Sequence, residues 1–176
     1  MSVSPDDAAA ALRDIDAIET RSARAFGYQC GSPHLILWGA LWVVGYGLCD
    51  LMPERAALIW AVIVPVGLAG SLRVYGSDRR RRYFAGIAAT MVGFFFAAFA
   101  VLTPRGLQVA ALIPLMIGAA YVVMGLWRGP RYVATGLAVA ALTLGGYFLL
   151  PAHFLLWQAV VGGGAMVLAG LWFKTL

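Results

Sequence analysis

The stretch HLILWGALWVVGYGLC, from His34 to Cys49, is sixteen residues long and contains no charged side chain, and Asp50 follows it directly. A helix needs roughly 20 mostly apolar residues to cross the hydrocarbon core of a bilayer, which is about 30 Å thick. Five further apolar runs of this kind follow along the chain. The sequence therefore predicts a membrane protein whose chain crosses the bilayer six times.

The composition of the chain agrees with a membrane protein. Of its 176 residues, 62% are hydrophobic and only 12% are charged, whereas a soluble domain is about a quarter charged. The predicted fold class is an all-α polytopic bundle, with residues 1–30 as a cytoplasmic amphipathic helix and linker and residues 31–176 as one transmembrane domain. The predicted spans are residues 34–50, 56–75, 83–102, 107–127, 131–150 and 153–173.

The basic residues predict the orientation of the chain. Six spans place both termini on one side, which receives eleven of the thirteen Lys and Arg residues, whereas Arg55 and Arg105 fall on the other side. Because basic loops stay in the cytoplasm, we expect a protein of the bacterial inner membrane with both termini in the cytoplasm. These loops account for the net charge of +5, so direct binding of nucleic acid is not predicted.

A run of four arginines, Arg79, Arg80, Arg81 and Arg82, directly precedes the third predicted span. Fixing the topology of the chain is a sufficient role for these residues. Attraction to anionic lipid would accompany that role, at ~1 kcal/mol per basic residue near the surface. Membrane lipids are therefore predicted partners at this loop.

Residues 5 to about 27 are predicted to form an amphipathic helix outside the bilayer, because apolar residues recur in them at helical spacing. Gly27 and the sequence Gly31-Ser32-Pro33 are predicted to end this helix before the first span. The apolar face either packs on the protein's own loops, or docks a cytoplasmic protein or a second copy of the chain. Its candidate docking residues are Leu12, Ile15, Ile18 and Phe26.

The six spans can be grouped into three similar hairpins. The second hairpin opens with Arg82-Tyr83-Phe84-Ala85, the third opens with Arg131-Tyr132-Val133-Ala134, and each hairpin has a proline at its outer turn. Duplication of an αα-hairpin explains these similarities, and chance matching of apolar sequence explains them equally well. A repeat of this kind would concern ancestry and packing rather than activity.

The residues needed for catalysis or metal binding are scarce. The span interiors contain no Asp, Glu, Lys or Arg, and ionisable groups there usually mark proton, ion or substrate pathways. His34 and His153 begin spans that run in opposite directions, so one bilayer thickness separates them and a single ion cannot bind both. Anchoring at the interface is the favoured role for each, although a dimer could bring two copies of one histidine together. We predict no catalytic, cofactor-binding or metal-binding residues, and an enzyme is the least favoured class.

Two prolines within predicted spans, Pro65 and Pro114, are expected to kink their helices. Kinked helices can surround a cavity for an apolar ligand, and Met91 and Phe95 are the other candidate lining residues of such a pocket. Glycine-rich helices also allow neighbouring backbones to approach closely. Close helix packing is the simpler explanation of the Gly and Pro content, and both explanations stay open at this point.

Three segments, SPDDAAAAL, SPHLILWGALW and GYFLLPAHFLLWQAVVGGG, resemble a family of small bacterial six-span inner-membrane proteins to which no activity is attached. The leading functional hypothesis is a non-enzymatic sensor or regulatory protein whose N-terminal helix docks a cytoplasmic partner. A small transporter or carrier of an apolar or lipid-like molecule is the alternative, and a structural subunit of a membrane complex is the third.

Overall fold

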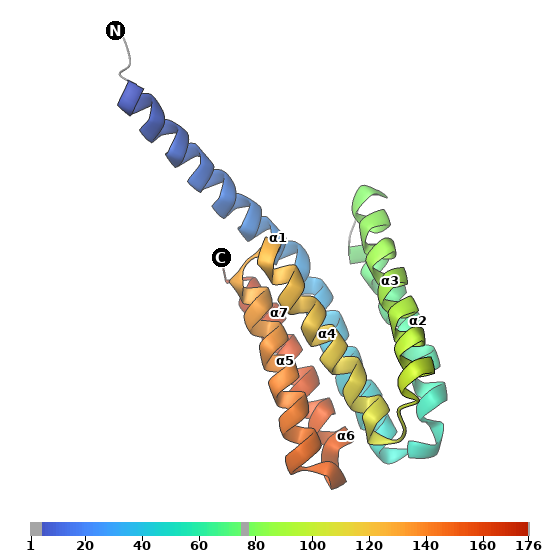
Figure 1. Ribbon diagram of the computed structural model, residues 1–176. Helices are drawn as coiled ribbons and strands as arrows, with labels where there is room; N and C mark the ends of the chain where they lie inside the picture. The colour runs from blue at the N-terminus through green and yellow to red at the C-terminus, as the bar shows by residue number, and fades with distance from the viewer. Residues whose placement is uncertain (1–4, 75–77, 176) are drawn as a thin grey trace.

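The computed structural model describes residues 5–74 and 78–175, which fold into helices joined by short links (Figure 1). Within these residues, six helical segments are long and apolar enough to cross a membrane, which confirms the predicted all-α membrane bundle. The two termini lie at the same end of the bundle (Figure 1). The elements are α1 Pro5–Leu51, η1 Pro53–Arg55, α2 Ala56–Val74, α3 Asp78–Leu102, α4 Leu107–Arg128, α5 Pro130–Leu149, η2 Pro151–His153, α6 Phe154–Trp157, η3 Gln158–Gly163 and α7 Gly164–Phe173.

Helix α1 is continuous over 47 residues, so the predicted break at Gly27 and Gly31-Ser32-Pro33 is wrong. Tertiary hydrogen bonds hold this stretch in the helix. The Tyr132 hydroxyl donates to the carbonyl of Gly27 at 3.0 Å, and the Ser32 hydroxyl donates to the carbonyl of Gly170 at 2.6 Å. These contacts offset the backbone hydrogen bond that Pro33 removes. The predicted division between residues 1–30 and residues 31–176 therefore falls inside one helix.

Helix packing in the bundle does not follow the three hairpins of the sequence. The most extensive contacts join α4 to α5, and α1 to α7 and η3, so the closest partners come from different hairpins. Glycines face each other at both contacts. A Cβ atom added to Gly118 would lie 2.9 Å from the carbonyl oxygen of Gly136, and one added to Gly39 would lie 2.8 Å from that of Gly163. Small residues let helix backbones approach closely in lipid.

The centre of the bundle is aromatic. Trp42 is only 1% exposed, and it meets Tyr46 edge to face with ring centroids 5.8 Å apart. Nearer the termini, Tyr132 stacks on Tyr28 at 5.7 Å and meets Phe173 edge to face at 4.7 Å. The rings of Tyr28, Tyr132 and Phe173 join α1 to α5 and α7, which lie side by side at this end of the bundle (Figure 1).

Helix α3 is the most peripheral of the six spans. No residue of its apolar stretch Phe84–Leu102 is buried, and Phe94 and Phe96 are 64% and 74% exposed. It packs on α2, and the two helices stand apart from α5 and α7 (Figure 1). Such a surface suits contact with lipid tails, and it leaves one side of α1 and α4 facing a space that α3 only partly covers.

Substitution of Gly136 by Ala tests the contact between α4 and α5. The new Cβ would lie 2.7 Å from the backbone nitrogen of Val122, and we expect overpacking to cost about 1–3 kcal/mol. The matched control is Gly145→Ala on the same helix, where a Cβ meets nothing within 4 Å. In thermal unfolding in detergent, Gly136→Ala should lower Tm by several degrees and Gly145→Ala should not. Equal Tm values for the two variants would contradict this packing.

Candidate functional site

A cavity of about 460 Å³ lies between α1, α2, α3 and α4, and its wall is almost entirely apolar. Of the four predicted pocket residues, Met91 and Phe95 line it from α3. The two prolines do not line it, since Pro65 is exposed on α2 and Pro114 is buried within the bundle. The cavity is therefore formed by the separation of α3 from α4 and not at the proline positions.

Helix α4 gives the cavity its length. Ile113, Ile117, Ala120, Met124 and Arg128 all line the wall, and they recur every three or four residues along one face of the helix. Fifteen residues of helix separate the first from the last, a rise of roughly 22 Å. The cavity is thus an elongated slot that runs parallel to the helices rather than a compact hole.

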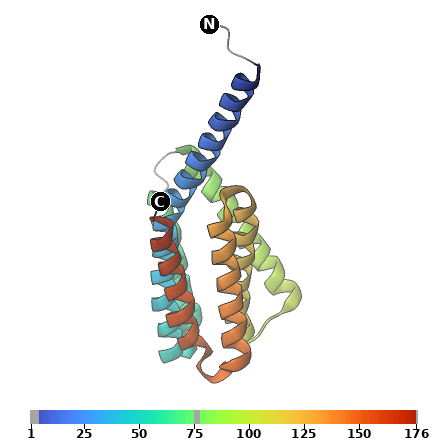
Figure 2. The same cartoon turned by 90° about the vertical axis from the view of Figure 1, so that its left-hand side faces the viewer.

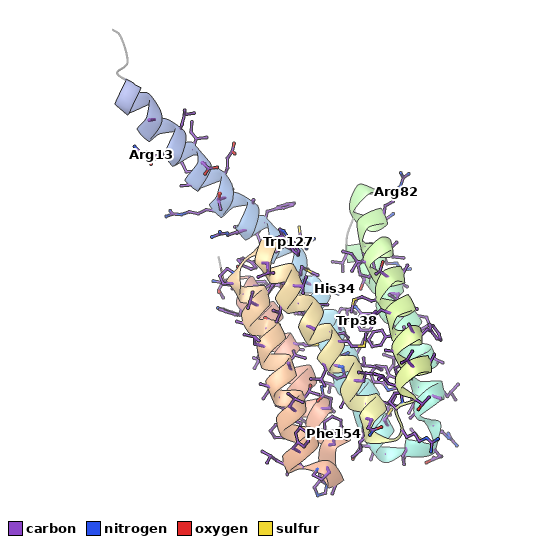
Figure 3. The ribbon with its side chains drawn as sticks, viewed as in Figure 1. Arg13, His34, Trp38, Arg82, Trp127 and Phe154 are labelled. Carbon is purple, nitrogen blue, oxygen red and sulfur yellow. The ribbon has the colours of Figure 1, made fainter. Side chains whose placement is uncertain are left out.

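The two ends of the slot differ chemically. Arg128, the last residue of α4, lines the end nearer the chain termini, together with His34 of α1 and Tyr132 of α5. The other end is walled by hydrophobic side chains such as Trp60 and Ile113. Figure 3 shows His34 and Trp38 reaching from α1 into the space between α4 and the α2–α3 pair. The slot therefore has a polar mouth, which is the end formed by Arg128, His34 and Tyr132, and an apolar opposite end.

A buried hydrogen-bond network fixes the cavity wall on α1. The fully buried Ser71 hydroxyl donates to the Gly67 carbonyl at 2.8 Å and accepts from Trp38 Nε1 at 3.0 Å. His34 Nδ1 lies 3.0 Å from the same oxygen. The Ser71 hydroxyl has one proton and donates it to Gly67, so it can only accept a hydrogen bond from His34. The hydrogen of the His34 contact is therefore on Nδ1. Ser71 thus orients two rings of the wall, and it is not arranged as a nucleophile activated by His34.

The two histidines have different surroundings. His34 lines the cavity and meets Phe84 edge to face, with ring centroids 5.5 Å apart. His153 is exposed in η2, at the end of the bundle away from the termini. Among the described residues, no group of three or more His, Cys, Asp or Glu side chains could hold a metal ion.

The candidate docking residues divide into two groups. Leu12, Ile15 and Ile18 are 68%, 54% and 63% exposed on the part of α1 that projects from the bundle. Phe26 is 52% exposed and also lines the mouth of the cavity. A single helix therefore carries both the predicted docking stripe and one wall of the slot.

The predicted lipid-contacting arginines lie where α3 begins. Arg81 Nε donates to the carbonyl of Leu72 at 3.0 Å, which ties the start of α3 to the end of α2. Arg82 is exposed, and Figure 3 shows it at the tip of α3, on the same side of the bundle as the N-terminus. The side chains of Arg79 and Arg80 lie outside the described part of the chain.

Gln158, which sequence reasoning missed, is fully buried in the sixth span. Its Nε2 donates to Thr143 Oγ1 at 3.3 Å, whereas its Oε1 has no hydrogen-bond partner among the described residues. It begins the π-helix η3, which ends at Gly163. The sequence offered one signal for this residue, an amide side chain within an otherwise apolar run. Only the packing of the helices shows that the amide is buried.

Removal of the Ser71 hydroxyl should weaken the cavity wall. Ser71→Ala leaves the indole of Trp38 and the imidazole of His34 without their shared acceptor, at a cost of about 1–3 kcal/mol for each buried group left unsatisfied. The control is Thr90→Ala, which removes an exposed hydroxyl that also bonds a carbonyl one turn earlier. Thermal unfolding should show a clear fall in Tm for Ser71→Ala alone, and an equal fall for both would refute the network.

Comparison with known proteins gives no match: no family model, curated protein or solved structure is significantly similar to this chain. The resemblance to small bacterial six-span membrane proteins stays a prediction. The features of this chain that bear on function are therefore the slot enclosed by α1, α2, α3 and α4, and helix α1 itself.

Proposed function

We propose that this integral membrane protein is a non-enzymatic sensor that binds a lipid-like molecule in the slot enclosed by α1, α2, α3 and α4. The exposed N-terminal part of α1 then docks a cytoplasmic protein according to whether the slot is filled. The slot supports the ligand class, because ligand sites are concave, mostly apolar and about 300–1,000 Å³ in volume. Its volume is about 460 Å³.

The continuity of α1 is the single observation that carries this proposal. Seven residues of α1 between Phe26 and Trp42 line the slot, and the same helix continues without a break to Pro5 (Figure 2). From His34 to Leu12 the helix rises roughly 33 Å. A packed helix is a rigid element that can carry a displacement over such a distance. A ligand that shifts the wall of the slot would therefore tilt the docking stripe.

The distribution of charge supports the proposed location of the docking stripe. The bundle end that bears both termini also bears Arg128, Arg131 and the basic start of α3. Basic residues accumulate on the cytoplasmic side of membrane proteins, which supports a docking stripe in the cytoplasm and a slot with its mouth in the inner leaflet. The bacterial inner membrane is the proposed location.

A carrier of lipid-like molecules is the second candidate, and the position of α3 favours it. This helix forms one wall of the slot, yet it has no buried residue in its apolar stretch. A wall that is held weakly could move aside and release the ligand to the other leaflet. The carrier requires movement of the ligand across the bilayer, whereas the sensor requires only movement of α1.

Entry of a lipid tail into the slot can be tested by tryptophan quenching. Replacement of Trp127, Trp157 and Trp172 by Phe leaves three tryptophans, all of which line the slot. Titration of dibromostearic acid into nanodiscs should quench their fluorescence. Ala120→Phe, which fills the slot, should reduce the quenching several-fold, whereas Ala119→Phe on the exposed side of α4 should not. Equal quenching in the two variants would exclude the slot as the binding site.

Coupling along α1 can be tested with spin labels at Thr20→Cys and Lys174→Cys, after Cys30 and Cys49 are replaced by Ala. Pulsed electron–electron resonance should show a changed distance between the labels when dibromostearic acid is added. A Gly-Ser-Gly insertion after Arg24 should abolish the change, and the same insertion after Ala10, beyond the label, should preserve it. An unchanged distance despite tryptophan quenching would reject the sensor and leave the carrier, which a flux assay in liposomes would examine.

A further inference from the structure

We infer that the slot selects a single-chain amphiphile with an anionic headgroup, such as an ionised long-chain fatty acid, and that Arg128 binds the headgroup. This inference rests on the proposed function, because it names the class of ligand for the same slot.

Among the residues that the structure describes, Arg128 is the only Arg, Lys, Asp or Glu that lines the slot. Arg128 is an exposed residue at the rim of the slot, so its guanidinium can meet a headgroup at the membrane surface without being buried first. Its planar fork of N–H donors matches the two oxygens of a carboxylate or of a phosphate. The electrostatics of the mouth therefore favour an anionic ligand over a neutral one.

The other polar groups at the mouth have their protons committed elsewhere. The Tyr132 hydroxyl donates to the Gly27 carbonyl at 3.0 Å, and His34 Nδ1 faces the Ser71 hydroxyl at 3.0 Å. Neither of these two protons is available to an anion without loss of a protein hydrogen bond. Recognition of the headgroup thus depends on Arg128, so one substitution should separate binding of the headgroup from binding of the tail.

The length of the slot fits one lipid chain. The lining face of α4 extends roughly 22 Å from Arg128 to Ile113, while one leaflet of hydrocarbon is about 15 Å, half of the whole core. Because Arg128 ends α4, a headgroup there would lie near the membrane surface, and a tail that fills the slot to Ile113 would extend past the middle of the bilayer. The partly open side next to α3 gives such a chain a lateral route from the bilayer.

The experiment uses the three-tryptophan variant in nanodiscs of zwitterionic lipid at alkaline pH, where the carboxyl group is ionised. Dibromostearic acid is compared with its neutral methyl ester. The acid should reach half-maximal quenching at about tenfold lower concentration, because a charge-assisted hydrogen bond contributes about 1.5–3 kcal/mol. Arg128→Gln should remove this preference, because it weakens binding of the acid but not binding of the ester. Arg128→Lys should retain part of the preference. Arg73→Gln, an exposed arginine that does not line the slot, is the control and should behave as the parent.

The outcomes distinguish this inference from the proposed function. Equal quenching by acid and ester, or an unchanged preference in a folded Arg128→Gln variant, would overturn the anionic selectivity while the slot remained a lipid site. Absence of quenching by either compound would refute the lipid-binding function itself. The third compound is dibromostearoyl lysophosphatidic acid, which carries a phosphate in place of the carboxylate. If it binds at Arg128 more tightly than dibromostearic acid does, the fatty acid is overturned as the ligand in favour of a phospholipid. Circular dichroism and Tm establish folding of each variant.

Discussion

The contact of glycine backbones across α4–α5 and α1–η3 is the constraint on which the rest of the bundle depends. Water does not drive helices together inside a bilayer, so association rests on close packing and on hydrogen bonds. Gly118 against Gly136, and Gly39 against Gly163, allow that approach. One pair joins α4 to α5 and the other joins α1 to the sixth span, and contacts of α5 with α7 and η3 unite them in one block. Helices α2 and α3 enclose the slot from the other side.

Helices α1 and α4 therefore belong both to the closely packed block and to the wall of the slot. On the slot side their side chains meet a loosely held α3, and on the other side they meet glycines and buried aromatic rings. One wall of the site is thus closely packed and the opposite wall is weakly constrained. This asymmetry suits a site that admits a flexible hydrocarbon chain from the side and aligns it against a closely packed surface.

The sequence predicted the six spans correctly because charges and turns interrupt the apolar runs, as Asp50 does after the first. It failed at Gly31-Ser32-Pro33, where local propensity favours a break but the Ser32–Gly170 hydrogen bond is tertiary. The slot was only partly foreseen, through Met91 and Phe95. Pro65 and Pro114 were proposed for their effect on single helices, whereas a slot arises from the spacing between helices. Hydropathy contains no information about that spacing, and for the same reason the burial of Gln158 was not predicted.

The π-helix η3 has a consequence for the tolerance of this span to changes in length. Phe154 and Phe173 are both buried, on the two sides of η3. At 3.6 residues per turn, their separation of nineteen residues would point them about 100° apart, whereas eighteen residues would complete five turns. The wider turns of η3 absorb that extra residue and return both rings to one face. A chain with a one-residue deletion between Gln158 and Gly163 would thus form a regular α-helix with the same buried face, whereas a one-residue deletion in the regular helix of α5 would rotate its glycine face away from α4.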